Sequence, residues 1–319
     1  MRVLFMGTSD FAIRALKELI AHHFEVIGVV TQPDRPSGRG KKLSPPPVKQ
    51  IAIENNLQVF QPEKVRKPEF VETLKQLTPD VIIVAAFGQL LPQAVLDIPP
   101  CGVINLHPSL LPKYRGAAPI QWALINGENE TGVTLMLLDV GEDTGDIICM
   151  ERIPIRIEDT AETLHEQLAD IGARLLVEVL AKLPQGQPPA ATPQNHADAT
   201  HAPRLTKTVG HINWNESATT IHNLIRGTAG WPGAYTFFRE GMLLKIIQSL
   251  PHEYEQKIKQ NISQEKPGTI KITSERQLFV ATGKGELQLL QVQPATKKIM
   301  EVYDFVNGYQ LKTGESFSV

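Results

Sequence analysis

The sequence has little cysteine and no long apolar segment. Only Cys101 and Cys149 are present, in no metal-binding spacing, and each lies in or beside an apolar run. We therefore expect buried free thiols in a reducing compartment. The N-terminal segment MRVLFMGTSDFA contains no run long enough for a signal peptide or a membrane span. From these absences we expect a cytoplasmic protein that is not associated with a membrane. Nothing in the sequence implies an obligate protein partner.

Two common catalytic signatures are also missing. The turn after the first apolar run holds a single glycine, Gly7, and matches neither G-x-G-x-x-G nor the P-loop pattern, so no dinucleotide or nucleoside triphosphate site is expected. Neither G-x-S-x-G nor a plausible nucleophilic cysteine is present. This argues against a covalent acyl-enzyme.

The patterns that are present predict an α/β domain followed by a smaller β-rich domain. The 319 residues, 42% of them hydrophobic, suffice for two cores. An apolar strand at 2–6, a helix from about 11 to 21 and a strand at 25–30 make a β-α-β opening, and 80–87 is a continuous buried strand. We predict a Rossmann-like, open, mostly parallel sheet over residues 1–188, with further strands at 57–60, 102–106, 131–139 and 146–155 and helices near 48–55, 68–77, 118–125 and 160–183.

A Pro-, Ala-, Gln- and His-rich segment without periodicity separates the two domains. We predict an interdomain linker over residues 189–205. Beyond it, over residues 206–319, five short strands and added helices suggest a small barrel of the oligonucleotide-binding (OB) type. The expected strands are 234–238, 243–250, 268–273, 277–281 and 286–293, and the expected helices are 218–226 and 300–307.

The strand at 102–106 carries two polar residues at its C-terminal end. Asn105 and His107 are two positions apart, so their side chains should project from the same face, and Pro108 should end the strand. A histidine and an amide held together can serve acid–base chemistry on a carbonyl. A capped strand end with a structural histidine fits this stretch equally well.

An acidic turn at 139–146 should reach the same edge of the sheet, because ligands of open α/β sheets bind outside the carboxyl ends of the strands. Its acids do not predict a metal site, since Glu142 and Asp143 are adjacent and point apart and the calcium-binding spacing is absent. A single aspartate that orients the histidine is favoured instead. Without a nucleophile, this set favours direct transfer of an acyl or one-carbon group to an amine.

The stretch 31–48, TQPDRPSGRGKKLSPPPV, is basic and rich in proline and glycine. It contains no acid after Asp34, and we expect a long surface loop because nothing in it can pack regularly. It is either a solvated insertion or a basic arm that meets phosphates. The absence of acids favours the arm.

Three motifs, in this order along the chain, resemble those of the folate-dependent formyltransferases. They are N-L-H-P-S-L-L-P, R-G-A-A-P-I-Q and D-V-G-E-D-T-G-D. The resemblance implies that Asn105, His107 and Asp143 form a catalytic trio and that 10-formyltetrahydrofolate is the donor, with no metal. It also implies that the folate lies along two segments. They contribute Phe87, Gly88 and Leu90, and Ser109, Leu110, Leu111 and Pro112.

Further motifs resemble the branch of this family that formylates methionyl-tRNA. They are G-T-S-D-F-A, T-Q-P-D-R-P-S-G-R-G-K-K, I-N-W, W-P-G-A-Y and Q-P-A-T-K-K, and they extend over nearly the whole chain. The resemblance implies that the basic loop contacts the tRNA through Arg39, Lys41 and Lys42 and that the C-terminal domain binds tRNA. Ser9, Trp122 and Thr296 depart from the family, which commonly has proline, arginine and glycine at these positions.

The implied reaction is direct attack of the α-amine of methionyl-initiator tRNA on the formyl carbon, through a tetrahedral intermediate, which gives N-formylmethionyl-tRNA for translation initiation. Two alternatives stay open. One is a formyltransferase that acts on an aminosugar nucleotide, and the other is a non-catalytic RNA-binding protein on the same scaffold.

Overall fold

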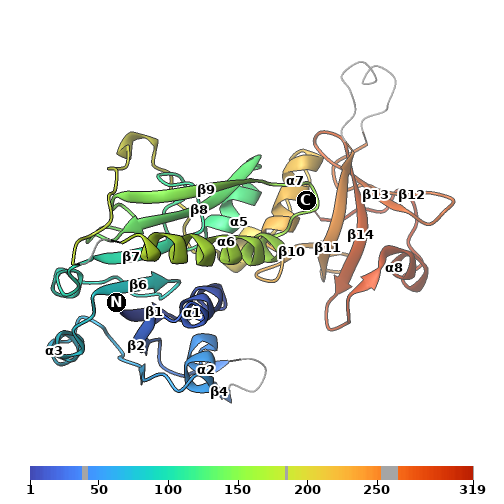
Figure 1. Ribbon diagram of the computed structural model, residues 1–319. Coiled ribbons are helices and arrows are strands. Elements are labelled where there is room, and N and C mark those ends of the chain that lie inside the picture. The colour runs from blue at the N-terminus through green and yellow to red at the C-terminus, as the bar shows by residue number, and fades with distance from the viewer. Residues whose placement is uncertain (38–41, 184–185, 253–264, 319) are drawn as a thin grey trace. The chain divides into compact units, whose positions relative to one another are not determined.

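The protein forms two compact units. A computed structural model describes residues 1–37, 42–183, 186–252 and 265–318 (Figure 1). The first unit comprises Met1–Pro119, Glu130–Pro154 and His165–Pro203, and the second comprises Ile120–Asn129, Ile155–Leu164 and Arg204–Val319.

A seven-stranded sheet organises the first unit, in the order β5-β2-β1-β6-β7-β8-β9. The strands from β5 to β7 are parallel, whereas β8 runs antiparallel to β7 and β9 antiparallel to β8. The predicted mostly parallel, Rossmann-like sheet is thus confirmed. Its strands are β1 (Arg2–Gly7), β2 (Glu25–Val30), β5 (Val59–Phe60), β6 (Val81–Ala85), β7 (Val103–His107), β8 (Glu130–Leu137) and β9 (Ile147–Pro154).

Helices cover both faces of this sheet. On one face, Leu4 and Ile82 from β1 and β6 pack in a buried cluster with Leu74 of α3. Helix α6 packs closely on β7. At Gly172 of this helix there is so little room that an added Cβ atom would lie 3.2 Å from the Leu106 side chain. The helices of the first unit are α1 (Phe11–Ala21), α2 (Pro47–Glu54), α3 (Pro68–Leu77), α4 (Gln93–Leu96) and most of α6 (Ala161–Ala181), whereas α5 (Pro119–Ile125) belongs, apart from Pro119, to the second unit.

Local sequence signals explain several boundaries. Proline stands at the start of α2 and α3, where its missing N–H costs no helical hydrogen bond. Strand β7 extends to His107, one residue beyond the predicted end, and stops at Pro108. Among the described residues, no helix combines the length and the apolar character needed to span a membrane.

The second unit is antiparallel and rich in strands. Its sheet has the order β10-β11-β14-β13-β12, with β15 paired to β14 (Figure 1). Trp214, fully buried, lies in its core, stacks on Phe317 and donates a hydrogen bond to Thr236 Oγ1 at 3.1 Å. The elements are η2 (Lys207–Gly210), α7 (Ala218–Gly227), β10 (Ala234–Phe238), β11 (Met242–His252), β12 (Ile270–Ile272), β13 (Leu278–Ala281), β14 (Glu286–Pro294), β15 (Met300–Glu301) and α8 (Val302–Gly308).

Three local predictions differ from the structure. The stretch 31–48 contains a short antiparallel pair, β3 (Arg35–Ser37) and β4 (Lys42–Ser44), so the expectation of no regular structure there was wrong. The predicted helix at 300–307 begins with strand β15 because its first two residues pair with β14. Helix α4 was not predicted, since four residues are too few to show a helical period.

Part of the segment predicted as a linker is bound to the first unit. Thr192 exchanges two backbone hydrogen bonds with Ile147, each of 2.8 Å, and Ala202 N donates to Arg115 O at 2.7 Å. Between these pairings lies the short helix η1 (His196–Asp198). Residues 192–202 therefore form part of the wall of the first unit.

Candidate active site

The carboxyl end of β7 holds two polar side chains inside the first unit. Asn105 and His107 are both buried, with 7% and 4% of their surfaces exposed. Strand β6 pairs with β7 on one side, and Thr134 of β8 lies opposite His107 on the other. Two residues of a strand that are two positions apart share a face, so both side chains lie on the same side of the sheet.

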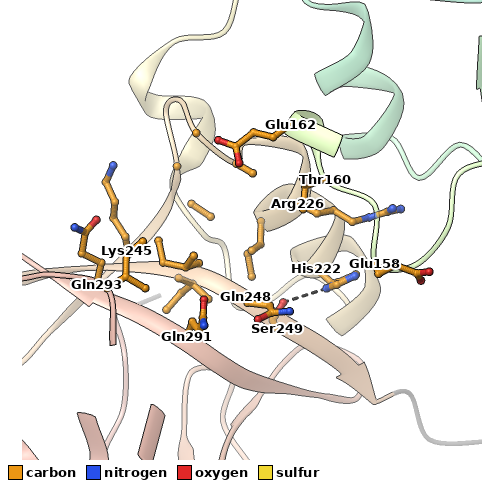
Figure 2. Close-up of a pocket in the computed structure, with 18 of the residues that line it drawn as sticks. Glu158, Thr160, Glu162, His222, Arg226, Lys245, Gln248, Ser249, Gln291 and Gln293 are labelled. Carbon is orange, nitrogen blue, oxygen red and sulfur yellow. Dashed lines mark hydrogen bonds between the residues drawn. The ribbon is translucent and has the colours of Figure 1, made fainter. Parts of the chain in front are cut away.

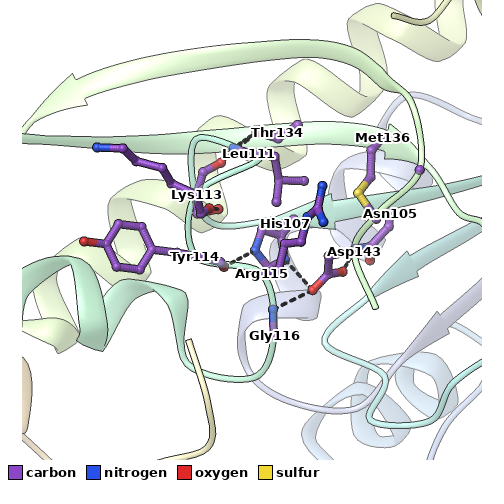
Figure 3. A network of polar contacts seen from close by, with 12 residues as sticks. Asn105, His107, Leu111, Lys113, Tyr114, Arg115, Gly116, Thr134, Met136 and Asp143 are labelled. Atoms are coloured by element: carbon purple, nitrogen blue, oxygen red, sulfur yellow. Dashed lines mark hydrogen bonds and ion pairs between the residues drawn. The ribbon is translucent and has the colours of Figure 1, made fainter. Parts of the chain in front are cut away.

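The turn between β8 and β9 brings Asp143 to these two side chains (Figure 3). Its Oδ2 atom lies 3.4 Å from His107 Nδ1, and its Oδ1 accepts a hydrogen bond from Asn105 Nδ2 at 3.4 Å. A third donor was not predicted: the backbone N–H of Gly116 donates to Oδ2 at 2.9 Å. The structure thus assembles the trio that the sequence pointed to, and adds a backbone amide.

The contacts of His107 fix where its protons lie. Its Nε2 atom lies 2.8 Å from the carbonyl oxygen of Tyr114, which can only accept, so Nε2 carries a hydrogen. The other nitrogen, Nδ1, faces the Asp143 carboxylate, and this contact is attractive only if a proton lies between the two atoms. Asn105 and Gly116 donate to the same carboxylate, so Asp143 is held beside the imidazole by two further hydrogen bonds. The geometry places an imidazole and a carboxylate within reach of one shared proton.

The S-L-L-P segment after β7 is fastened to β8. Thr134 Oγ1 donates to Ser109 O at 2.7 Å and accepts from Leu111 N at 3.2 Å. The Ser109 hydroxyl donates to Lys113 O at 2.7 Å, and both Ser109 and Leu111 are buried. The half-buried Leu110 and Pro112 remain as side chains of this segment that a ligand can reach.

The turn after β6 presents one buried and one exposed apolar residue. Phe87 lies in the core, and its carbonyl oxygen accepts hydrogen bonds from Thr8 Oγ1 at 2.9 Å and Gln32 Nε2 at 3.3 Å. Gly88 has a φ of +85° and is exposed, and Leu90 is 70% exposed. Of the residues predicted here, Gly88 and Leu90 can contact a ligand directly, whereas Phe87 supports the turn.

The flanks of the basic stretch are neutralised by acids. Lys49 Nζ lies 2.8 Å from both carboxylate oxygens of Asp34, and Arg35 lies 3.5 Å from Glu63. A hydrogen bond from Gln61, together with that from Lys49, holds the pKa of Asp34 below its usual range. The predicted tRNA contacts Arg39 and Lys41 lie outside the described residues, and Lys42 is placed only by its backbone in β4.

Other candidates from the sequence have structural explanations. Asp139, in the acidic turn, accepts hydrogen bonds from Thr144 Oγ1 and Gly141 N and so shapes the turn. No cluster of three or more His, Cys, Asp or Glu side chains suited to a metal occurs among the described residues. Both thiols are free, and burial raises the pKa of Cys149.

A cavity of about 410 Å³ lies in the second unit (Figure 2). Its wall includes two buried polar residues of α7 that the sequence analysis did not single out, His222 and Arg226. His222 contacts Ser249 Oγ and Ile157 O at 3.1 Å each, and Arg226 donates to Arg156 O at 2.9 Å. Burial lowers the pKa of both side chains. Their polar atoms serve internal hydrogen bonds, so they hold the unit together.

Comparison with known proteins places both units in one class. The family described as "Formyl transferase" matches residues 1–180, and "Formyl transferase, C-terminal domain" matches residues 204–310. A solved sugar 3N-formyl transferase, WlaRD, covers 93% of this chain and 99% of its own with a TM-score of 0.67 at 20% identity. HypX from Aquifex aeolicus, solved in complex with tetrahydrofolic acid, gives a TM-score of 0.63 at 18% identity over 99% of this chain and 48% of its own. The fold and the matched families define a formyltransferase.

Full-length relatives narrow this class. A methionyl-tRNA formyltransferase of Acetivibrio thermocellus is 48% identical over 99% of both chains. Another, of Caldanaerobacter subterraneus, is 45% identical over 98% of this chain and 99% of its own. The chain belongs to the methionyl-tRNA formyltransferase family and is therefore an enzyme.

Proposed function

We propose that the protein transfers the formyl group of 10-formyltetrahydrofolate to the α-amine of methionyl-initiator tRNA by direct attack. The observation that carries this proposal is the contact of the buried His107 with the partly buried Asp143, beside the Asn105 amide. Two hydroxyls close to His107 along the strands, Ser109 and Thr134, donate to backbone carbonyls. The site therefore offers proton transfer and hydrogen-bond donors, and these two hydroxyls are engaged elsewhere.

Each residue of the trio has its own part in the proposed reaction. The amine nitrogen forms a bond to the formyl carbon, and the carbonyl oxygen becomes an oxyanion. The Asn105 Nδ2 hydrogen that does not face Asp143 donates to this oxygen, and the positive charge of a protonated His107 lies nearby. One such donor contributes on the order of 3 kcal/mol to barrier lowering. The bond from carbon to the folate N10 then breaks, N10 takes a proton supplied through His107, and the amine gives up a proton that Asp143 helps to relay.

The donor binds along two turns at the carboxyl edge of the sheet. Gly88 and Leu90 supply an exposed turn after β6, and Leu110 and Pro112 supply the segment after β7. Both turns follow neighbouring parallel strands, so they lie at the same edge. This placement agrees with the crevice rule for open α/β sheets and leaves Asp143 beside the formyl carbon.

The acceptor is a tRNA that the basic stretch and the second unit hold through phosphates. The full-length relatives named for methionyl-tRNA support this acceptor. The aminosugar alternative rests on a fold neighbour of 20% identity, WlaRD, and is the weaker candidate. A protein that acts on tRNA and a folate works in the cytoplasm.

Replacing the trio tests the proposed chemistry. His107→Ala and Asp143→Asn should each lower kcat by about 10² to 10⁴-fold, since each removes the shared proton or its acceptor. Binding of the folate donor, measured by calorimetry, should be retained. Asp146→Asn is the matched control, because this acid lies in the same turn and is exposed. Near-normal turnover in His107→Ala or Asp143→Asn would contradict the assignment.

A further inference from the structure

We propose that Gln194 is a positioning residue for catalysis, which acts by holding the backbone of the Asp143 turn. The inference rests on the proposed function, since it assigns Gln194 a role through Asp143. Gln194 lies in the segment that the sequence predicts to be a linker. In the structure it is 5% exposed and reaches the turn between β8 and β9.

Both amide hydrogens of Gln194 are used on this turn. Its Nε2 atom donates to Asp143 O at 3.0 Å and to Gly145 O at 2.7 Å. Two carbonyls on either side of Thr144 are thus tied to one side chain. A glutamine amide has two donor hydrogens, so none is left for another acceptor.

Arg115 fixes the orientation of that amide. Its Nε and Nη2 atoms donate to Gln194 Oε1 at 3.2 and 2.7 Å, and Arg115 is itself 6% exposed. A guanidinium can only donate, so the oxygen of Gln194 must face Arg115 and the nitrogen must face the turn. Arg115 Nη2 also contacts His196 Nδ1 at 3.0 Å, which anchors the guanidinium from its far side.

The backbone of the Asp143 turn is in an unfavourable conformation, so the turn needs this support. Asp143 has a φ of +54°, in the left-handed region that a residue with a side chain adopts at a cost. Gly145 lies so close to Leu137 O that a Cβ atom would overlap it. Two bonds to the turn's carbonyls oppose its relaxation and keep the carboxylate aimed at His107.

Adjacent residues thus hold Asp143 from two sides. Gly116 donates its N–H to the carboxylate, while Arg115 acts on the backbone through Gln194. The Arg115–Gln194 pair sets the position of Asp143 without contact to any reacting atom. A displacement of about 1 Å at a catalytic group can cost on the order of 10²-fold in rate.

Gln194→Glu and Gln194→Met in the full-length enzyme test this role. Glutamate keeps the acceptor for Arg115 and loses both donors, and methionine keeps the volume and loses donors and acceptor. Both variants should lower kcat by about 10 to 10²-fold with little change in the KM of the folate donor. Gln187→Met, at an exposed position just before this segment, is the control. Wild-type kcat in the glutamate variant would overturn the proposal. It would mean that the two hydrogen bonds from Gln194 to the turn do not affect the rate and that only the acceptor for Arg115 does.

Two further readouts separate positioning from general stability. In an Asp143→Asn background, Gln194→Glu should cause almost no additional loss of kcat, since both changes act through one carboxylate. A full, multiplicative loss would contradict the proposal. The exchange rate of the Gly116 amide hydrogen should rise in Gln194→Glu, because its bond to Asp143 loosens, and an unchanged rate would also contradict it. Absence of formyl transfer in the wild type would refute the proposed function, whereas the Gly116 amide reports on the placement of Asp143 without any activity.

Discussion

At the scale of single residues, His107 lies between two oxygen acceptors. The Tyr114 carbonyl accepts from Nε2 and the Asp143 carboxylate faces Nδ1, so rotation of the imidazole would lose both contacts. Asp143, which is partly buried, is in turn held by donors from Asn105 and Gly116.

The sequence could predict some of these residues and not others. The two-residue period of a strand placed Asn105 and His107 on one face, and the resemblance to the folate-dependent formyltransferases singled out Asp143 among the acids of the turn. The Gly116 N–H and the Tyr114 carbonyl are backbone groups, which every residue carries, so no side-chain pattern reveals them. Gln194 was missed because an aperiodic, proline-rich segment gives no sign of which side chain turns inward.

The lowered pKa of His222 predicts how the free energy of unfolding depends on pH. Burial, with the nearby Arg226 charge, lowers the pKa of His222, so the unfolded chain binds a proton more readily than the folded protein. Stability should therefore fall as the pH drops below about 6.5, the ordinary histidine value, by at most about 1.4 kcal/mol per pH unit from this group. Burial lowers the pKa of His165 as well, which adds in the same direction.

Denaturant unfolding between about pH 7 and 5 measures this effect. His222→Gln should give a shallower decline of the free energy of unfolding with falling pH, whatever its stability at pH 7. The exposed His252→Gln change controls for the loss of a histidine, and His222→Gln should flatten the decline more than this control does. An equal slope in wild type and His222→Gln would show that this histidine does not contribute.

At the scale of elements, the turn between β14 and β15 carries an unfavourable residue. Thr296 is exposed and has a φ of +65°, a conformation that a β-branched residue rarely adopts. The sequence showed threonine at a position where the family commonly has glycine, and the backbone supplies the reason. Only the structure could give the sign of φ, since the turn residues themselves fit several turn types.

Thr296→Gly should stabilise the second unit. Relief of the left-handed strain, about 1–2 kcal/mol, exceeds the added backbone entropy of glycine, about 0.5–1 kcal/mol, so we expect a gain of about 1 kcal/mol. Thermal or denaturant unfolding measures it. Lys297→Gly, at the next position, should destabilise, and a loss of stability in Thr296→Gly would refute the strain argument.

The β3–β4 stretch is an element whose charge the sequence showed and whose structure it did not. Its charge pattern was plain, whereas short strands in a proline- and glycine-rich segment leave no periodic signal. The structure also shows that Lys49 and Arg35 face acids. The predicted phosphate contacts stay those that the resemblance implied, Arg39, Lys41 and Lys42.

Arg39→Ala combined with Lys41→Ala should weaken the binding of charged tRNA and leave folate binding intact. Loss of two phosphate contacts should reduce the slope of log K against log salt by about 1 to 2. Filter binding over a salt series measures both quantities. Lys64→Ala with Arg66→Ala removes two exposed charges of the same unit as a control. An unchanged affinity and slope would make the loop ordinary surface.

At the scale of the whole molecule, the division into an α/β unit and an antiparallel, strand-rich unit could be predicted because each has its own hydrophobic period. The exact membership of the units could not, since residues 120–129 and 155–164 join the second unit through contacts between distant parts of the chain. On the proposed function, the first unit holds the trio and the second unit supplies a further surface for a large acceptor.

The choice of acceptor tests the central claim most directly. Purified full-length protein is supplied with 10-formyltetrahydrofolate labelled in the formyl group, together with charged initiator tRNA or with an aminosugar nucleotide. We predict that the label appears on the methionine of the tRNA and that the His107→Ala protein transfers none. Label on the aminosugar nucleotide instead, or on neither acceptor, would contradict the account.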